Sequence, residues 1–173
     1  MGRVLTAIAP HEPEAHGLLA LMELNASRTA ARTDASGEPI LMLEQDRALW
    51  DQLQIRRGMQ ALGRARELEG AGGFYALQAA IIACHAQAST ADETDWPRIS
   101  GLYAELAALV IVDGLANEPA LKTYHLLGSV RGDLLHRLGR HAEARAAFEA
   151  AAALAGNRRE QDLLRRRAAE PPT

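Results

Sequence analysis

Apolar residues recur at helical spacing along most of this chain, in segments separated by glycine, proline and short polar turns. Leu18 and Met22, for example, are four residues apart and therefore lie on one face of a helix. No convincing alternating strand is present, apart from a possible short extended piece at Pro39 to Leu43. We expect helices over residues 13–32, 46–70 and 74–88, from Trp96 onward, after Pro119, and from Asn157 onward.

Several of these helices carry start signals in the sequence. Pro13 suits the first turn of a helix, and Asp46 is a candidate N-cap for the helix that runs to Gly70. Asn157 and Glu160 have the spacing of a capping box. Gly72 and Gly73 break the chain before a helix with Phe74, Leu77, Ile81 and Cys84 on one side.

The strongest pattern is a small-and-large signature near the end of the chain. Close packing of two antiparallel helices needs small residues, and a large side chain fills the groove to the next helix. Arg131 and Gly156 depart from the usual tetratricopeptide pattern, which has leucine and proline there. The predicted repeat core comprises Gly132, Leu135, Leu138, Gly139, Ala144, Phe148 and Ala151.

Composition narrows the class of protein. With 173 residues the chain suffices for one domain or a small repeat array, and its richness in alanine favours helix. A net charge of −3 and a 4% aromatic content give no reason to expect binding to a nucleic-acid backbone or to stacked bases. The single cysteine excludes an internal disulfide, and no signal peptide or long apolar run is visible. We therefore expect a cytoplasmic protein.

Candidate chemical motifs are weak. His11 and His16 suggest a zinc-protease helix, but a five-residue spacing puts them on different faces, and Pro13 disturbs the geometry at Glu12. Cys84 and the adjacent His85 have no partner pair at metal-ligand spacing, so we expect both in the core. We predict no catalytic residues, no metal site, no cofactor and no enzymatic activity.

One segment carries a family resemblance. Residues 12–51, "EPEAHGLLALMELNASRTAARTDASGEPILMLEQDRALWD", resemble the C-terminal region of a group of bacterial extracytoplasmic-function RNA polymerase sigma factors. In that group a helical, tetratricopeptide-like extension follows the sigma core. Later pieces also match, namely "FYALQAAIIACHA", "TDWPRISGLYAEL" and "YHLLGSVRGDLLHRLGRHAEARAAFEAAAAL".

The resemblance implies an all-α fold of antiparallel helical hairpins stacked as a tetratricopeptide-like array. It implies a single helical domain, 1–173, cut from the C-terminal part of a longer sigma factor. Residues 1–70 would be the family-specific region, with a connector at 33–46, and residues 71–173 would form repeat-like hairpins. The implied function is a regulatory interaction module whose partners are the sigma core and RNA polymerase, without direct DNA or membrane contact. The alternative is a free-standing helical-repeat adaptor that binds a protein or peptide.

Within the resembling segment, a group of charged residues and one tryptophan form the candidate interaction site. We expect Arg28 and Arg32 to lie four residues apart on one helix and to pair with carboxylates if the loop folds back. The apolar run Ile40 to Leu43 would then cover the junction between two helices. The alternative is a solvated loop with unpaired charges. The candidate residues are Arg28, Arg32, Asp34, Asp46, Arg47 and Trp50.

A departure from the resembling proteins lies between Val110 and Ile111, where they carry an additional helical segment. Tyr103 and Phe148 occupy equivalent repeat positions but stand closer than two repeats of 34 residues require. We expect intervening residues at this point. In the alternative, a true deletion, residues 102–115 would form one continuous helix.

Overall fold

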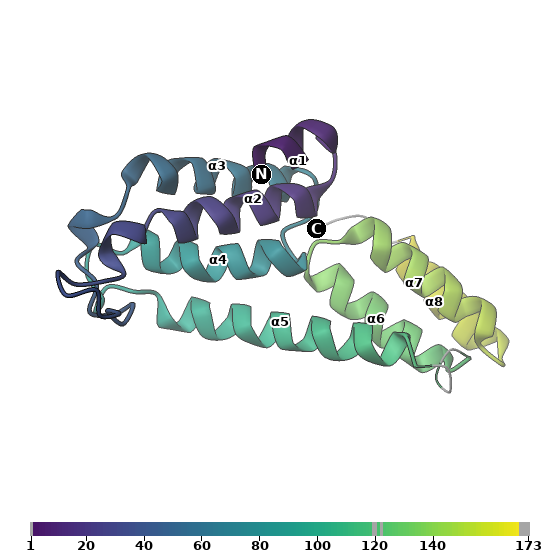
Figure 1. The fold of residues 1–173 in the computed structure, drawn as a ribbon. Coiled ribbons are helices and arrows are strands. Elements are labelled where there is room, and N and C mark those ends of the chain that lie inside the picture. Colours follow the sequence, from purple (N-terminus) through teal and green to yellow (C-terminus); the bar gives the residue numbers. More distant parts are fainter. Residues whose placement is uncertain (1, 119–120, 122, 170–173) are drawn as a thin grey trace. The chain divides into compact units, whose positions relative to one another are not determined.

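The computed structural model describes residues 2–118, 121 and 123–169, and within these it is all-helical. The chain divides into two compact units, residues 1–104 and residues 105–173. Figure 1 shows the elements in sequence colours. The α-helices are α1 (Gly2–Ile8), α2 (Pro13–Ala26), α3 (Gln52–Glu67), α4 (Phe74–Gln87), α5 (Trp96–Ala116), α6 (His125–Arg137), α7 (His141–Leu154) and α8 (Arg158–Ala168), with short 3-10 helices η1 (Thr29–Ala31) and η2 (Arg47–Leu49).

The first unit is built on α2, which packs against both α3 and α4. Glycines permit this close approach. A Cβ on Gly17 would lie 2.8 Å from the backbone nitrogen of Ala76 in α4, and one on Gly58 in α3 would lie 2.6 Å from Leu24 Cγ. Both distances are shorter than real Cβ contacts allow, so the helix spacing depends on these two glycines.

The start of α3 differs from the prediction. Asp46 caps only η2, where its carboxylate accepts a hydrogen bond from the Ala48 backbone nitrogen at 2.9 Å. Asp51 caps α3 instead and accepts from the backbone nitrogens of Leu53 and Gln54 at 2.8 and 3.0 Å. The prediction of one helix from Asp46 was therefore wrong, because a second N-cap side chain begins a new helix five residues later.

The first predicted helix is shorter than expected. The helix α2 ends at Ala26, six residues before the predicted end at Arg32, and a turn of 3-10 helix follows. The loop after it closes on a single antiparallel bridge between Thr33 and Pro39, so the predicted extended piece is only this isolated pair. Phe74, expected on the buried side of its helix, is exposed.

The end of α3 is a Schellman motif. The backbone nitrogen of Gly70 donates to the Ala65 carbonyl at 2.8 Å, and that of Glu69 donates to the Arg66 carbonyl at 3.0 Å. The residue in the left-handed conformation is Glu69, with φ 59°, and not a glycine. The predicted helix stop before the glycine-rich stretch is present, but a non-glycine residue carries the strained conformation.

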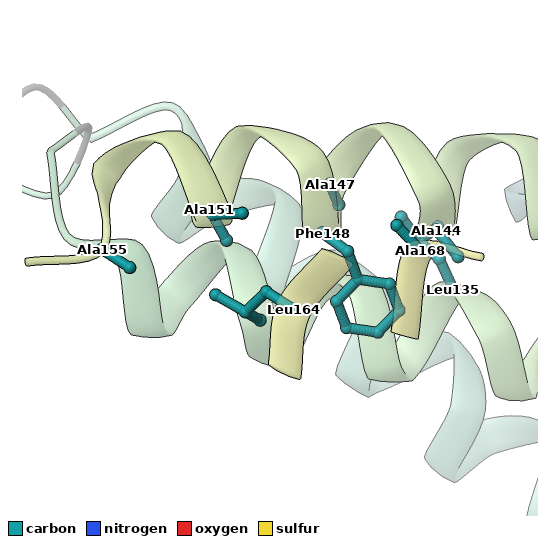
Figure 2. Close-up of a cluster of buried hydrophobic side chains, with 9 residues drawn as sticks. Leu135, Ala144, Ala147, Phe148, Ala151, Ala155, Leu164 and Ala168 are labelled. Atoms are coloured by element: carbon teal, nitrogen blue, oxygen red, sulfur yellow. The ribbon is translucent and has the colours of Figure 1, made fainter. Parts of the chain in front are cut away.

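The second unit contains an antiparallel hairpin, α6 and α7, with α8 packed on α7. Gly139, with φ 73°, makes the turn and forms a second Schellman motif. Figure 2 shows the ring of Phe148 among side chains of all three helices, including Leu135 of α6 and Leu164 of α8. Asn157 caps α8, as predicted, by accepting from the Glu160 backbone nitrogen at 2.9 Å.

Helix α5 runs through Val110 and Ile111 as one uninterrupted element. This is the arrangement expected of a true deletion, and the expected intervening residues are not present. The predicted helix after Pro119 begins at His125, and Pro119 itself lies outside the described residues.

The division of the chain also differs from the predicted sub-parts. The predicted boundary was at residue 70, whereas α4 packs against α2 and therefore belongs to the first unit, which ends at Ala104. Over the part of the chain that the structure describes, no helix is both long and apolar enough to cross a bilayer.

Candidate functional site

Trp50 lies close to two arginines in the first unit. Its side chain is only 3% exposed. The guanidinium carbon of Arg28 is 5.7 Å from the centre of the Trp50 ring, and that of Arg47 is 5.2 Å away. Both distances suit a cation–π interaction, which contributes about 0.5 to 2 kcal/mol depending on desolvation. We call Arg28, Arg47 and Trp50 the Trp50 cluster.

Arg47 also closes the C-terminal end of α4. Its Nη1 donates to the carbonyl oxygens of His85 and Ala88, the latter at 2.6 Å, and its Nη2 donates to Thr94 Oγ1 at 3.2 Å. The last carbonyls of a helix have no partner within the helix, and they carry the negative end of the helix dipole. The Arg47 guanidinium donates hydrogen bonds to these carbonyls and places a positive charge at the negative end of the dipole. It thereby joins η2 to α4.

The Arg28 side chain makes fewer hydrogen bonds than the Arg47 side chain. Its Nη2 donates to Asn25 Oδ1 at 3.0 Å, while its buried Nε has no hydrogen-bond partner among the residues that the structure describes. Burial lowers the pKa of Arg28, and the positive charge of Arg32 lowers it further. No carboxylate pairs with this guanidinium in the described residues, so the Trp50 ring and the Asn25 amide are its main support.

The buried imidazole of His85 lies beside the cluster. Its ring centre is 5.5 Å from that of Trp96 in an edge-to-face arrangement, and its Nδ1 has no hydrogen-bond partner within the described part of the chain. Burial lowers the pKa of His85, and the charges of Arg47 and Arg28 add to that effect. Burial and the two nearby cations thus both favour the neutral form of the His85 imidazole.

The predicted carboxylate network does not form. Arg32 donates to the Asn25 carbonyl at 2.9 Å and is exposed, and neither Asp34 nor Asp46 pairs with a described arginine. Asp34 instead accepts from Ser36 and from the Glu38 backbone nitrogen, which lowers its pKa and holds its own turn. Asp34 and Asp46 thus accept hydrogen bonds from backbone donors two to four residues further along the chain.

The apolar run of the connector was also predicted to cover a helix junction. Leu41 and Leu43 are exposed, at 70% and 49%, so that prediction was wrong for them. Trp50, in contrast, is buried, with two guanidinium groups near its ring. His85 is buried, as expected, but the sequence did not place it, Asn25 or Thr94 at this site. The end of α4 was the available signal, since a helix C-terminus attracts a basic side chain.

The predicted repeat core is buried in the second unit. Leu135, Ala144, Phe148 and Ala151 are buried, and a Cβ on Gly132 would lie 2.6 Å from the Phe148 ring. Gly139 supplies the turn. Arg167 of α8 forms an ion pair with Asp133 of α6, and its guanidinium carbon lies 5.3 Å from the Phe148 ring centre. These contacts join α8 to the hairpin.

The side chains considered as candidate metal ligands have structural contacts instead. His16 Nε2 lies 3.0 Å from the Pro10 carbonyl oxygen, and Glu12 is the N-cap of α2. Among the residues that the structure describes, no group of three or more His, Cys, Asp or Glu side chains is placed to hold a metal ion. Burial raises the pKa of the Cys84 thiol, which disfavours the reactive thiolate.

The chain is similar to one protein family and to one other protein, and neither has a described activity. Residues 1–66 match a family of unknown function, DUF6596. The chain is 37% identical to an uncharacterized protein of Rhizobium meliloti (strain 1021) over an alignment of 201 residues, which covers all of this chain and 47% of that protein. The chain therefore spans about half the length of this relative. The alignment is longer than the chain's 173 residues, so the relative carries residues that this chain lacks. No solved structure matches the chain.

Proposed function

We propose that the chain is a non-catalytic interaction module of an extracytoplasmic-function sigma factor, tuning transcription initiation by RNA polymerase. The observation that carries the proposal is the Trp50 cluster, formed by residues of the segment that resembles such sigma factors. Arg47 fixes the segment after the connector to α4 by donating to carbonyls at the end of that helix, and it also contacts the Trp50 ring. A segment so fixed presents a defined surface, which suits a role in binding.

We also propose that α6 and α7 form a tetratricopeptide-like repeat, with α8 covering its open side. Gly132 and Ala144 allow the two helices to approach, and Phe148 fills the space toward Leu164 of α8. Repeat arrays need a terminal helix whose outer face is polar. The helix α8 fits this need, since it is rich in arginine and buries only Leu164 and Ala168.

The proposal is tested with the natural gene product that contains this chain. The complete product, the same product without residues 1–173, and the isolated chain are each tagged and purified from their own cells. We expect the complete product to retain RNA polymerase subunits and the isolated chain to retain none. We further expect removal of residues 1–173 to change the yield of run-off transcripts. A complete product that retains no polymerase contradicts the proposal.

A second candidate is a free-standing helical-repeat adaptor. It is favoured by an open cavity of about 360 Å³ in the first unit, lined by α3, α4 and the beginning of α5. In the same purification, an adaptor would retain one other protein in place of polymerase subunits, and residues 1–173 would suffice for that retention.

A further inference from the structure

Helix α8 has a buried side and an exposed side, and the exposed side is rich in arginine. Leu164 and Ala168 belong to the buried core of the second unit. Because an α-helix turns by about 100° per residue, six residues of α8 point away from that core. We call them the α8 arginine face. All six are exposed, and they are Arg158, Arg159, Asp162, Leu163, Arg165 and Arg166.

The positive charges of this face are largely unpaired. The guanidinium groups of Arg158, Arg159 and Arg166 make no hydrogen bond or ion pair with any residue that the structure describes. Arg165 lies 3.8 Å from Asp162 Oδ1, which is too far for a hydrogen bond. Since the face holds four arginines and one aspartate, it keeps a net charge of +3.

The stability of α8 accounts for only part of this charge. Arg165 and Arg166 lie in the last turn, where the negative end of the helix dipole favours cations. Arg158 and Arg159 are the first two residues of the helix, where the positive end of the dipole disfavours them. A face that only has to be wetted can mix both signs of charge. Helix stability and solubility therefore do not account for the arginines at the start of α8.

We propose that the α8 arginine face binds an acidic helix of a partner protein. Arg158 and Arg165 are seven residues apart and so stand about 10.5 Å apart along the helix axis. Arg159 and Arg166 repeat this spacing. Carboxylates seven residues apart on a second helix match it, and a guanidinium pairs with a carboxylate through two parallel hydrogen bonds. An aliphatic side chain of the partner covers Leu163, which is 48% exposed.

Asp162 and Leu163 favour a protein partner over a phosphate backbone or a lipid surface. Asp162 lines the same open hollow as three of the arginines. A nucleic-acid strand has a phosphate at every nucleotide and sets charge near this carboxylate, whereas a protein helix can place an uncharged residue opposite it. Leu163 is the one large apolar side chain of the face, and a helix that inserts into a lipid surface needs a whole apolar side. The proposal rests on the proposed role as an interaction module and adds the chemistry of its partner.

The experiment uses the complete 173-residue chain and a fluorescein-labelled, capped, alanine-rich peptide. The peptide carries two pairs of glutamates one heptad apart and a leucine beside them. One control peptide has glutamine in place of glutamate, and another has alanine in place of leucine. Binding is followed by fluorescence anisotropy at low salt. A labelled DNA duplex of random sequence and vesicles of an anionic phospholipid are measured in the same buffer.

We expect the acidic peptide to bind and the glutamine peptide to bind at least about tenfold more weakly, a difference of about 1.4 kcal/mol. The alanine peptide should bind more weakly than the acidic peptide. Arg159→Gln with Arg166→Gln should weaken binding of the acidic peptide at least about fivefold. The matched control is Arg56→Gln with Arg57→Gln, which removes the same charge from exposed arginines of α3 and should leave the affinity within about twofold. Circular dichroism checks that each variant is folded.

Asp162→Asn tests the face in the opposite direction. It removes the negative charge that lies among the arginines, so the acidic peptide should bind about two- to fivefold more tightly. A variant that only disturbed the fold of α8 would weaken binding, so a gain in affinity reports on the charge of the face itself.

Equal binding of the acidic and glutamine peptides, an equal loss in the α3 control, or weaker binding by Asp162→Asn would overturn the proposal. So would binding of the DNA duplex or the vesicles without binding of the acidic peptide, which would replace the protein partner with a nucleic acid or a lipid. If the peptide does not bind while the natural gene product still retains polymerase, only the α8 assignment fails. If the peptide binds and polymerase is absent, only the sigma-factor role fails.

Discussion

Gly132 of α6 lies directly against the ring of Phe148 in α7, so closely that a Cβ on the glycine would stand 2.6 Å from Phe148 Cε1. We expect Gly132→Ala to lower the free energy of unfolding by about 1 to 3 kcal/mol, because the ring must move within a packed core. Thermal melts measure the change. Gly114→Ala is the control: Gly114 is a helical glycine of the same unit with open space around it, and the alanine should stabilise its helix slightly.

Phe148 is 1% exposed and fills the space among α6, α7 and α8. Truncation to alanine leaves a cavity, and we expect Phe148→Ala to lower the free energy of unfolding by about 3 to 5 kcal/mol. Leu154→Ala, at an exposed position of the same helix, should change it by no more than about 0.5 kcal/mol. Equal urea-unfolding midpoints for the two variants would contradict the central place of Phe148.

Arg32 and Arg47 lie at the two ends of the connector and have different roles. Arg47→Ala removes the donors that satisfy two carbonyls at the end of α4, and we expect it to lower the free energy of unfolding by about 2 to 3 kcal/mol. Arg32→Ala removes one exposed hydrogen bond and should cost no more than about 1 kcal/mol. Arg47→Lys should not restore stability, because an ammonium lacks the fork of a guanidinium. Chemical denaturation of the three variants measures these changes in the free energy of unfolding.

His85 should make the first unit less stable in mild acid. Its pKa is lowered by burial and by Arg47 and Arg28, so the folded protein binds a proton here less readily than the unfolded chain, whose histidines titrate near 6.5. The stabilising contribution is complete above that value and is lost as the pH falls toward the lowered pKa. We expect His85→Phe, which keeps an aromatic ring beside Trp96, to reduce the loss of stability as the pH falls below about 6.5. Identical pH profiles for the variant and the natural protein would contradict the assignment.

Glu69 ends α3 in a left-handed conformation that costs a side-chain residue roughly 1 kcal/mol or more. We expect Glu69→Gly to raise the melting temperature, because glycine adopts this conformation without the Cβ penalty. Glu69→Ala keeps the Cβ and should give no such gain. A gain with alanine equal to that with glycine would mean that the charge of Glu69, and not its backbone, sets the effect.

Short-range patterns in the sequence predicted those helices whose ends depend on neighbouring residues. Helical spacing of apolar residues and proline at the first turn identified α2, α4 and α5 at their starts, and Asn157 caps α8 as its spacing predicted. The buried hairpin residues were predicted for the same reason, because small residues opposite Phe148 are a pattern visible along the chain.

The partners of the charged connector were decided only by the tertiary structure. Arginine and aspartate close in sequence suggested ion pairs, yet each aspartate satisfies backbone donors within its own turn, and Arg47 reaches carbonyls of α4 some forty residues away. A side chain bonds whichever unsatisfied group the fold brings to it, and the unpaired carbonyls at a helix end become a target only once that helix is placed. Thus the sequence by itself determined where most helices begin and which hairpin face is buried. Contact between η1 and η2 brings Arg28, Arg47 and Trp50 into one cluster, which no local pattern of the sequence predicts.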